Sequence, residues 1–495
     1  MPHPRIALLC AWISTCACWA QQRITIDAQA PASPFPHVWE ETFGSGRAIL
    51  TLRDSYRNDL VAVKRATDFH YVRFHAIFHD EVGVYNEDEH GNPVYNFSYV
   101  DQIYDGLLER GVRPFVELSF MPRKLAFNPD ALHPFWYKQN VSPPKSMERW
   151  DALISEFARH LVARYGIDEV AHWYFEVWNE PNIDFWNGIP RDRSYFDLYQ
   201  HTARALKGVN ERLRVGGPAT AAAAWVPSFL LYAAAHHVAV DFVTTHAYAD
   251  DTVEDLFGTN EEIPLDDRVC RAVAKARKEI QASPMPSMPL FLTEWNVPGM
   301  KEARDTSFVG AALANTVREC DGLVDMLAFW TFSDVFEEGG PIARPFEGMF
   351  GLRAKGGINK PSFYAFSLLH RLGDRRIANA TSNLLVTRRA DGSLAAAVWN
   401  LVDPDKQGTP VRVRLEFEHA PAGSPVTYTV VDDIHGNALA AYRAMGSPQY
   451  PTEAQIRSLN AAAALAPERV RLNGDHLDVE LQVNALALIE IPMTR

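Results

Sequence analysis

Strand-like and helix-like segments alternate eight times between residues 38 and 372, and this alternation limits the fold more than any other feature of the sequence. The apolar, strand-like runs are residues 38–43, 71–75, 113–118, 173–178, 214–218, 241–246, 290–294 and 326–332. The amphipathic stretches include residues 99–110, 147–165, 193–212, 268–280, 307–320 and 361–372. A strand–helix unit repeated eight times predicts an α/β fold, the (β/α)8 TIM barrel, with parallel strands buried on both faces. The pattern is weakest at the first strand and at residues 219–225.

After about residue 376 the pattern changes to short alternating strands between turn-rich segments. The predicted strands are residues 384–388, 395–401, 411–417, 426–431 and 477–483, with a helical insert at 452–464. Such strands predict an antiparallel β-sandwich. We therefore expect a (β/α)8 barrel over residues 36–375 and an accessory antiparallel β-sandwich domain over 376–495. Residues 21–35 contain one alternating run and are predicted to add a strand to the β-sandwich.

Residues 1–20 have the features of a secretory signal peptide. Arg5 is their single charge, the apolar run of residues 6–20 follows, and the small residues Cys18 and Ala20 suit cleavage. The apolar run is too short to span a bilayer, so we expect no membrane span in the mature protein. The predicted location is secreted or periplasmic.

Cleavage of this segment would remove three of the five cysteines and leave Cys270 and Cys320. Both lie in predicted helices. An oxidising compartment would allow them to pair, but we expect two separate buried thiols.

The charge balance narrows the choice of partners. The 495 residues carry a formal net charge of −13, and the isoelectric point is about 5.7. This balance argues against nucleic acid and anionic membranes, because phosphate binding needs clustered Lys and Arg. The chain has no P-loop and no strand-linked glycine fingerprint for a dinucleotide, and we expect no cofactor.

Two glutamates stand at the ends of predicted strands, in Trp178-Asn179-Glu180-Pro181 and in Thr293-Glu294-Trp295-Asn296. These are the fourth and seventh strands, and barrel strands end at the rim where such enzymes carry their active sites. A glycosidase needs two carboxyl groups, one that protonates the leaving oxygen and one that attacks the anomeric carbon; a retaining enzyme holds them about 5–5.5 Å apart. A lone glutamate at a barrel rim is more often part of a salt bridge. Two glutamates that each follow a strand with a buried-type pattern instead favour a retaining glycosidase.

The neighbours of the two glutamates suggest how each would be tuned. Whichever glutamate is the acid must stay protonated near neutral pH, and we expect burial and the nearby carboxylate to raise its pKa. Because Pro181 follows it, Glu180 is expected to be extended at the strand terminus. Asn179 can donate to a sugar hydroxyl. Glu294 lies between apolar residues and needs specific hydrogen bonds to stay ionised, for which Tyr248 is a candidate donor.

Other polar residues follow the second, sixth and eighth predicted strands. They are His75, His79 and Asp80, then His246 and Tyr248, then Asp334, Glu337 and Glu338. We expect no metal at His75, His79 and Asp80, because no fourth ligand is nearby and glycoside hydrolysis needs no metal. Together these residues mark the rim where a substrate would bind.

The two glutamate motifs resemble those of clan A of the retaining glycoside hydrolases. Several stretches resemble family 39 within it, which contains β-xylosidases and α-L-iduronidases. They are Phe43-Gly44-Ser45-Gly46-Arg47-Ala48, Tyr71-Val72-Arg73-Phe74-His75, Glu117-Leu118-Ser119-Phe120-Met121-Pro122, Thr245-His246-Ala247-Tyr248, Phe332-Ser333-Asp334-Val335-Phe336-Glu337-Glu338, Lys360-Pro361-Ser362-Phe363 and Met445-Gly446-Ser447-Pro448-Gln449-Tyr450. The resemblance spans roughly residues 36–495. It implies Glu180 as acid/base and Glu294 as nucleophile. It also implies a sugar site lined by Asn179, His75, Phe120, His246, Tyr248, Trp330 and Glu338.

The resemblance implies an oligosaccharide substrate and exo-acting removal of β-1,4-linked xylose from xylooligosaccharides. An α-L-iduronidase would need Arg or Lys for the sugar carboxylate. The segment after the eighth strand is acidic, and Arg344 is its nearest cation. The remaining alternatives are a glycosidase for another neutral sugar and a carbohydrate-binding protein without catalysis.

Overall fold

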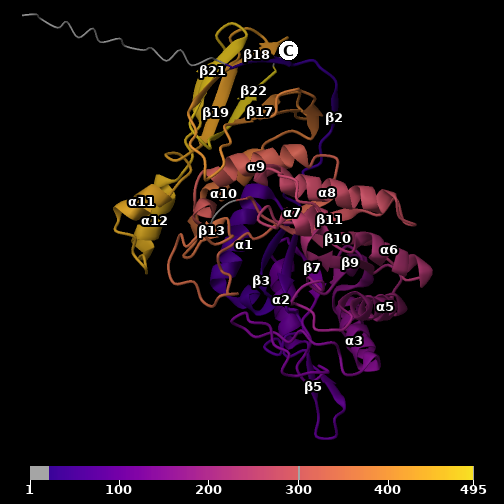
Figure 1. Cartoon of the computed structure of the whole chain (residues 1–495). Helices are drawn as coiled ribbons and strands as arrows, with labels where there is room; N and C mark the ends of the chain where they lie inside the picture. The colour runs from indigo at the N-terminus through magenta and orange to yellow at the C-terminus, as the bar shows by residue number, and fades with distance from the viewer. Residues whose placement is uncertain (1–21, 299–300, 494–495) are drawn as a thin grey trace, which may run out of the picture.

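The computed structural model describes residues 22–298 and 301–493. Figure 1 shows a barrel ringed by helices with a smaller β-rich domain at one end. The predicted signal peptide, residues 1–20, lies outside the described residues. Within the described residues, every helix is too short or too polar to cross a membrane.

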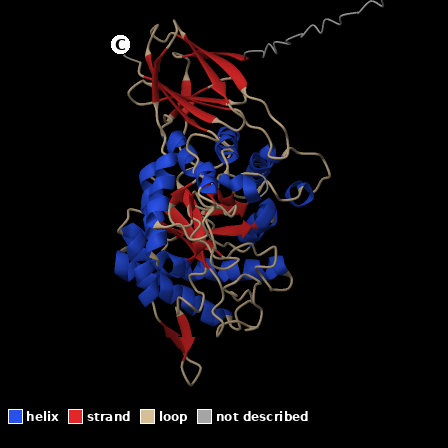
Figure 2. Ribbon diagram, turned by 90° about the vertical axis from the view of Figure 1, so that its left-hand side faces the viewer, coloured by secondary structure: helices blue, strands red, loops and turns tan. Residues whose placement is uncertain are grey.

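Eight parallel strands form a closed barrel, which confirms the predicted (β/α)8 fold. The order around the barrel is β3 (Thr42–Arg47), β4 (Tyr71–His75), β7 (Arg113–Leu118), β8 (Tyr174–Val177), β9 (Arg214–Thr220), β10 (Phe242–His246), β11 (Leu290–Trp295) and β12 (Met326–Phe329). Strand β12 pairs with β3 and closes the ring. The strands lie at the centre and are covered by helices, so they are buried along most of their length (Figure 2).

Helices surround the barrel: α1 (Asp54–Thr67), α2 (Ser98–Leu108), α3 (Met147–Tyr165), α4 (Ile167–Val170), α5 (Arg191–Val209), α6 (Val226–Ala235), α7 (Val253–Phe257), α8 (Leu265–Gln281), α9 (Phe308–Glu319) and α10 (Pro361–His370), with short 3-10 turns η1 (Ala48–Leu52), η2 (Ala221–Ala223) and η3 (Lys301–Asp305). Helix α3 shows how the sequence sets such an element. The Ser146 hydroxyl accepts from the backbone N–H of Arg149 and caps the first turn. Trp150, Ile154 and Phe157 then fall on one buried face.

Aromatic side chains fill the N-terminal end of the barrel. Tyr71, Phe115, Tyr174, Phe242, Phe291 and Met326 stand at or near the beginnings of six strands and pack in one cluster. The ring centroids of Phe242 and Phe291 are 5.1 Å apart, and Tyr174 lies 5.1 Å from Phe291. Because packed side chains close this end, a site can form only at the C-terminal ends of the strands.

The first barrel strand begins later than the sequence predicts. Residues 38–43 are the predicted strand, whereas β3 is Thr42–Arg47. Apolar Val38 and Trp39 belong to the segment that leads into the barrel, and the strand itself contains two glycines. A Cβ on Gly44 would lie 2.1 Å from the Trp330 ring, so glycine is required where β3 passes this ring. A search for apolar runs therefore misplaces this strand.

The second domain consists of two sheets that face each other, as the sequence predicts. One has the order β2 (Ala32–Pro34), β15 (Arg375–Ile377), β16 (Leu384–Arg388), β17 (Leu394–Trp399), β22 (Leu486–Ile491), β19 (Pro425–Val431) and β20 (Glu468–Arg471). The other has the order β1 (Gln22–Asp27), β18 (Val411–Glu418) and β21 (His476–Leu481). Strand β1 pairs in parallel with β18, so both ends of the described chain contribute to this domain. The remaining pairs are antiparallel.

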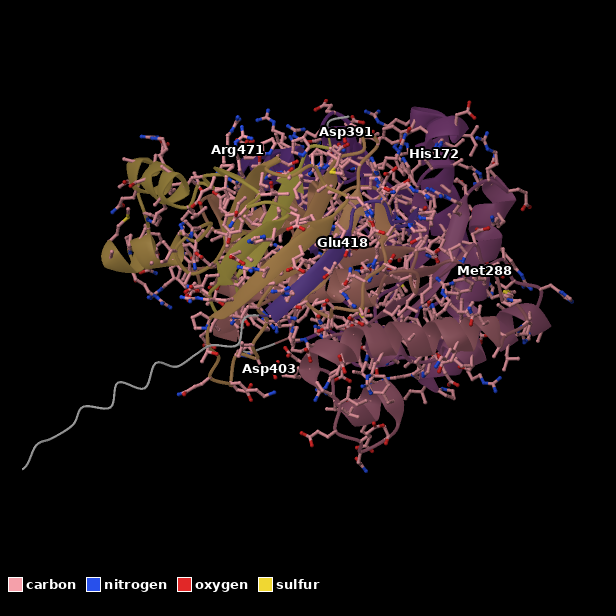
Figure 3. All side chains as sticks on the ribbon, turned by 90° about the horizontal axis from the view of Figure 1, so that it is seen from above. His172, Met288, Asp391, Asp403, Glu418 and Arg471 are labelled. Carbon is pink, nitrogen blue, oxygen red and sulfur yellow. A yellow bond between two sulfur atoms is a disulfide. The ribbon has the colours of Figure 1, made fainter. Side chains whose placement is uncertain are left out.

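Apolar residues from both sheets form the core of this domain, among them Ile24, Val386, Leu415 and Ile489. Helices α11 (Leu439–Ala444) and α12 (Glu453–Ala462) form the insert, and α12 packs against the hairpin β13 (Arg353–Ala354) and β14 (Ile358–Asn359) of the barrel. A second hairpin, β5 (Tyr85–Glu87) and β6 (Pro93–Tyr95), follows β4. The domain rests on α9 and α10, and Figure 3 looks down on it, with Glu418 marking the end of β18.

Cys270 and Cys320 form a disulfide, so the expectation of two separate thiols is wrong. Cys270 lies in α8, and Cys320 directly follows α9. These two helices flank β11 and pack side by side, which brings the Cα atoms to 5.0 Å, within the range that a disulfide spans. Helical location alone does not prevent pairing. The register between two packed helices decides it, and a sequence pattern does not contain that register.

Candidate active site

Glu180 leaves its strand in an unusual backbone conformation. Strand β8 ends at Val177, and Glu180 has φ +43°, in the left-handed region. The expectation of an extended residue before Pro181 is therefore wrong. The Glu180 backbone N–H donates to the carbonyl of Ala219, at 2.8 Å, and this bond across to β9 holds the turn. Left-handed backbone at a residue other than glycine costs about 1–2 kcal/mol, and such strain is concentrated at functional sites.

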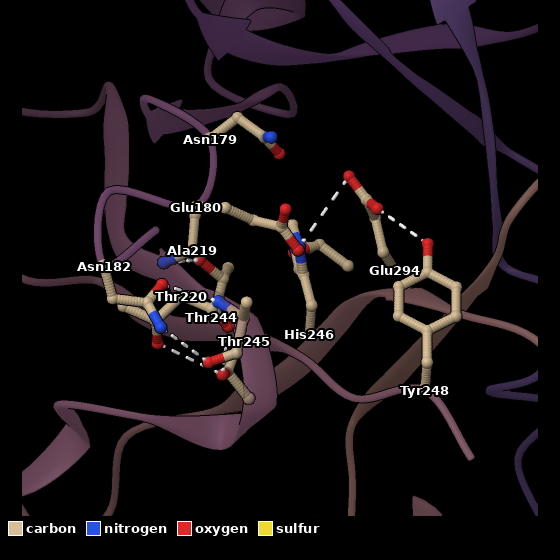
Figure 4. Close-up of polar contacts among 12 residues, drawn as sticks. Asn179, Glu180, Asn182, Ala219, Thr220, Thr244, Thr245, His246, Tyr248 and Glu294 are labelled. Carbon is tan, nitrogen blue, oxygen red and sulfur yellow. Dashed lines mark hydrogen bonds and ion pairs between the residues drawn. The ribbon is translucent and has the colours of Figure 1, made fainter. Parts of the chain in front are cut away.

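The carboxyl groups of Glu180 and Glu294 face each other beside His246, as Figure 4 shows. One oxygen of each glutamate and one nitrogen of His246 all lie within 4.8 Å of one another. Both glutamates are at most 12% exposed. The two groups that the sequence separates by more than a hundred residues thus meet in one pocket. Their spacing is that of two carboxyl groups that act on a single bond.

Glu294 is held by donors on both of its oxygens. The Tyr248 hydroxyl donates to Oε2 at 2.7 Å (Figure 4), and Arg73 Nη1 donates to Oε1 at 2.7 Å. The predicted contact from Tyr248 is therefore present in the structure. Burial and the charge of Glu294 raise the pKa of the Tyr248 phenol well above its ordinary value, so Tyr248 stays a donor. Such donors stabilise the ionised form of a buried carboxyl group.

Arg73 is the centre of a buried charge network that sequence reasoning missed. Its guanidinium also donates to Glu176 at 2.6 Å, to Asn179 Oδ1 at 3.0 Å and to Glu117 at 2.8 Å. Thr293 donates to the other Glu176 oxygen at 2.8 Å. Burial works against the charge of Arg73, but the three carboxylates raise its pKa above the ordinary value. The sequence indicates only that a charged residue inside a buried strand needs a partner, and it does not indicate which residues these partners are.

Glu180 is adapted to carry a proton near neutral pH. Burial raises its pKa to about 7. Burial also lowers the pKa of His246 to about 4, so its ring is neutral. Arg73 Nη2 lies 3.5 Å from His246 Nε2, and because arginine can only donate, Nε2 must accept. The ring proton is then on Nδ1, which donates to Glu180 Oε1 at 2.9 Å and leaves Oε2 for an incoming group.

His75 connects Glu294 to the acidic segment after β12. Its Nδ1 bonds to Glu117 at 2.6 Å, and its Nε2 lies 3.7 Å from Glu294 and 4.0 Å from Glu338. Burial works against protonation, but Glu117 and Glu294 raise the pKa of His75. Burial, with Glu294 and Glu180 nearby, raises the pKa of Glu338 to about 8. Glu338 is thus a neutral acid near neutral pH, able to donate as well as accept.

Two aromatic side chains complete the lining that the sequence predicts. The Trp330 ring lies 4.7 Å from the His75 ring and 5.9 Å from the Arg73 guanidinium. The Phe120 ring lies 6.1 Å from His75. These contacts connect all nine predicted site residues, namely Asn179, Glu180, Glu294, His75, Phe120, His246, Tyr248, Trp330 and Glu338.

Five further candidates at the rim lie elsewhere. Asp334 accepts from the backbone N–H of Gly351 at 2.7 Å and pairs with Lys360 at 3.4 Å. His79 binds the carbonyl of Tyr137 at 3.1 Å, and Asp80 accepts from the backbone of Arg123. Glu337 pairs with Arg47, at 2.8 Å. Arg344 pairs with Glu347 at 3.4 Å, in a neighbourhood that includes Tyr442 of the second domain. None of these contacts brings the five into the pocket between Glu180 and Glu294.

Among the described residues, two groups have donors that suit a metal ion: Glu180 with His246 and Glu294, and His37 with Glu40 and His370. Imidazole and carboxylate suit several divalent ions. In the first group Arg73 already supplies a positive charge to Glu294, which opposes a second cation. In the second, Glu40 accepts from His37 and His370 at 2.7 and 2.9 Å.

A (β/α)8 barrel with two facing carboxyl groups at its C-terminal rim defines a glycoside hydrolase. The family model described as glycosyl hydrolases family 39 matches residues 22–474. The chain therefore belongs to glycosyl hydrolase family 39.

Known proteins resemble the chain over different lengths. A "Beta-xylosidase" of Geobacillus stearothermophilus is 37% identical over 477 residues, which is 93% of this chain and 94% of that protein. The crystal structure of a monomeric beta-xylosidase from Caulobacter crescentus CB15 superposes with a TM-score of 0.85 at 36% identity, covering 96% of this chain and 100% of that chain. The "Alpha-L-iduronidase" of Homo sapiens is 32% identical over 125 residues, which is 25% of this chain and 17% of that protein.

Proposed function

We propose that this chain is a retaining, exo-acting β-xylosidase that removes xylose from xylooligosaccharides. The observation that carries the proposal is the separation of the two buried carboxyl groups, since an oxygen of Glu180 and an oxygen of Glu294 lie within 4.8 Å of each other. An inverting enzyme holds its carboxyl groups about 6.5–9.5 Å apart to admit a water molecule between them and the sugar. Oxygens within 4.8 Å of each other fit the retaining separation of about 5–5.5 Å, at which one carboxylate attacks directly.

In the first step the Glu294 carboxylate attacks the anomeric carbon of the bound sugar. The bond from this carbon to the leaving oxygen breaks, and Glu180 gives its proton to that oxygen. Arg73 and Tyr248 fix the position of Glu294 for the attack. The hydrogen bond from His246 Nδ1 to Oε1 of Glu180 orients the acid. The product of this step is a glycosyl ester of Glu294.

In the second step Glu180 is a carboxylate and acts as a base. It takes a proton from a water molecule, the water oxygen attacks the anomeric carbon, and the ester bond to Glu294 breaks. Two inversions at the same carbon restore the original configuration, so the released xylose is the β anomer.

Proton NMR of the anomeric signals during fast hydrolysis of 4-nitrophenyl β-xyloside tests the proposal. We expect β-xylose first and α-xylose only through later mutarotation. Initial formation of α-xylose would contradict the retaining mechanism. A protein that binds the glycoside and releases no 4-nitrophenol would instead be a carbohydrate-binding protein without catalysis.

The preference for xylose rests on the relatives and on the charges in the pocket. The relative that matches 93% of the chain is a β-xylosidase, whereas the iduronidase matches 25%. A panel of 4-nitrophenyl glycosides would separate xylose from glucose and arabinose. A preference for another neutral sugar would change the substrate and leave the mechanism as proposed.

Xylosides should be hydrolysed with at least about a hundredfold higher kcat/KM than α-L-iduronides. A uronate would lie near the Glu294 carboxylate, and like charges about 4 Å apart cost about 4 kcal/mol at an effective dielectric of 20. Arg73 is already engaged by three carboxylates. Arg344, the cation that the sequence left open, pairs with Glu347. Burial raises the pKa of Glu338 to about 8, so this group is neutral below that pH and adds little repulsion.

Both substrates should be measured on one preparation. Comparable rates on xyloside and iduronide would mean that a cation enters the sugar pocket, and the xylosidase proposal would fail.

The pH dependence of kcat/KM on xylobiose should follow the proton of Glu180. Its pKa is raised to about 7, so the acid form predominates below pH 7 and is lost as the pH rises through 7. Activity should then fall about tenfold per pH unit above this value. In Glu180→Gln the fall near pH 7 should be absent from the residual activity. Persistence of the same fall would assign the proton to another group, such as Glu338.

We also propose that the enzyme acts outside the cytoplasm. The signal-like pattern of residues 1–20 motivates this, and the Cys270–Cys320 disulfide suits an oxidising compartment. N-terminal sequencing of the protein recovered from culture medium or periplasm tests it. A mature chain that begins near residue 21 is expected, and retention of residue 1 in the cytoplasm would contradict it.

A further inference from the structure

The rim loops after four adjacent strands are tied together by Arg47, at the end of β3. Its Nη1 donates to Glu337, after β12, at 2.8 Å, and its Nε donates to Glu81, after β4, at 2.7 Å. Its guanidinium carbon lies 5.4 Å from the ring centroid of Trp136, in the loop between β7 and α3. Arg47 is 5% exposed, so these contacts are largely shielded from water. We call Arg47, Glu81, Trp136 and Glu337 the rim arc.

Trp136 joins the rim arc to the segment that carries Glu338. Its backbone N–H donates to the Glu338 carbonyl at 2.8 Å. Its ring packs on the backbone of Gly340, where a Cβ would lie 3.2 Å from the ring. The side chain is nevertheless 53% exposed. The indole is therefore fixed on one side by Arg47 and Gly340 while its remaining surface faces solvent, beside a residue of the sugar site.

The positions of the site residues set the direction in which the substrate lies. The leaving group departs beside Glu180, which follows β8. Of the side chains predicted to bind the sugar, Trp330 and Glu338 follow β12, which lies opposite β8 in the barrel, and His75 ends β4, midway between these two strands. The bound sugar therefore has its anomeric carbon toward Glu180 and its far end toward the rim arc. A second sugar attached at that far end would have to occupy the space of Glu338 and Trp136.

We propose that the rim arc, with Trp136 at its centre, is the wall that limits the glycone pocket to one pentose. The wall excludes a second sugar on the non-leaving side, so that the enzyme removes single residues from the chain end. This inference rests on the proposed function, because it explains how a pocket at this barrel rim selects the terminal residue of an oligosaccharide. It assigns the exo preference to a side chain that does not touch the reacting atoms.

The test is the first product released from 4-nitrophenyl β-xylobioside. With the wall intact, the enzyme should release xylose and leave 4-nitrophenyl xyloside. In Trp136→Ala a second sugar should fit behind the first, so xylobiose and 4-nitrophenol should form directly. We expect the xylobiose share of the initial products to rise at least about tenfold. Even a small change in the space of a substrate pocket alters substrate preference by about this factor. Trp136→Phe, which keeps a smaller ring, should give an intermediate share.

The matched control is Phe127→Ala, because Phe127 is a 76% exposed aromatic residue of the same loop outside the rim arc. It should keep the product pattern of the unmodified enzyme. Circular dichroism and thermal melting confirm that each variant is folded. Xylobiose from the unmodified enzyme, or xylose alone from folded Trp136→Ala, would overturn the inference. An unmodified enzyme that cleaves neither 4-nitrophenyl xyloside nor the xylobioside would overturn the proposed function instead.

Discussion

Glu294→Ala should lower turnover of 4-nitrophenyl β-xyloside by at least about a thousandfold. In the proposed mechanism the glycosyl-enzyme forms on this carboxylate, and the nearby carboxylates of Glu117 and Glu176 are fully buried against Arg73. The deleted side chain also leaves space on the face from which it attacks. Added azide should enter this space and displace the aryl group in one inversion, which gives α-xylosyl azide. Product analysis by NMR together with the rate of 4-nitrophenol release measures both effects.

The control for Glu294→Ala is Glu302→Ala, which removes an exposed glutamate of η3 in the loop that follows β11. It should retain the activity of the unmodified enzyme. Residual activity of Glu294→Ala above roughly a hundredth of that value, without added azide, would show that Glu294 is not the nucleophile.

Glu180→Ala should have an effect that depends on the leaving group. An aryl group with a good leaving oxygen needs little acid assistance, so formation of the glycosyl-enzyme survives and its hydrolysis becomes slow. The expected result on such a substrate is a low kcat with a low KM. Xylobiose has a poor leaving group and should lose nearly all activity. Steady-state kinetics on the two substrates measures the difference.

Azide separates the roles of the two glutamates further. In Glu180→Ala it should intercept the glycosyl-enzyme after one inversion and give β-xylosyl azide, the opposite anomer from that of Glu294→Ala. Equal losses of Glu180→Ala on the aryl substrate and on xylobiose, with no azide product, would rule out the acid/base role.

Much of the barrel could be predicted from the sequence, because parallel strands buried on both faces are continuous apolar runs. Residues 71–75 and 113–118 were predicted with the bounds of β4 and β7. Strand β3 was misplaced, since its glycines follow from contact with the Trp330 ring. The weak pattern after β9 also has a structural cause. Ala222 and Trp225 have positive φ, and the chain turns there before α6 begins.

The meeting of Glu180 and Glu294 in one pocket could be predicted, because both follow barrel strands and such strands end at the same rim. The network around Arg73 could not, because its partners lie on β7, β8 and β11 and meet only when the barrel closes. The protonation of Glu338 follows from burial beside two other carboxyl groups, which no local pattern contains. The left-handed backbone of Glu180 depends on a bond to β9.

The Cys270–Cys320 disulfide determines what proteolysis of the loop after β11 would release. Cys270 and Cys320 close the intervening chain into a covalent ring that contains β11 and Glu294. A single protease cut at η3, within this ring, would leave the two pieces joined, and the strand that carries Glu294 would stay attached to helices on both sides. On a denaturing gel such a nicked molecule would run as one chain until a reductant is added. Only then would the polypeptide that carries Glu180 and Glu294 separate from the one that carries Trp330 and Glu338.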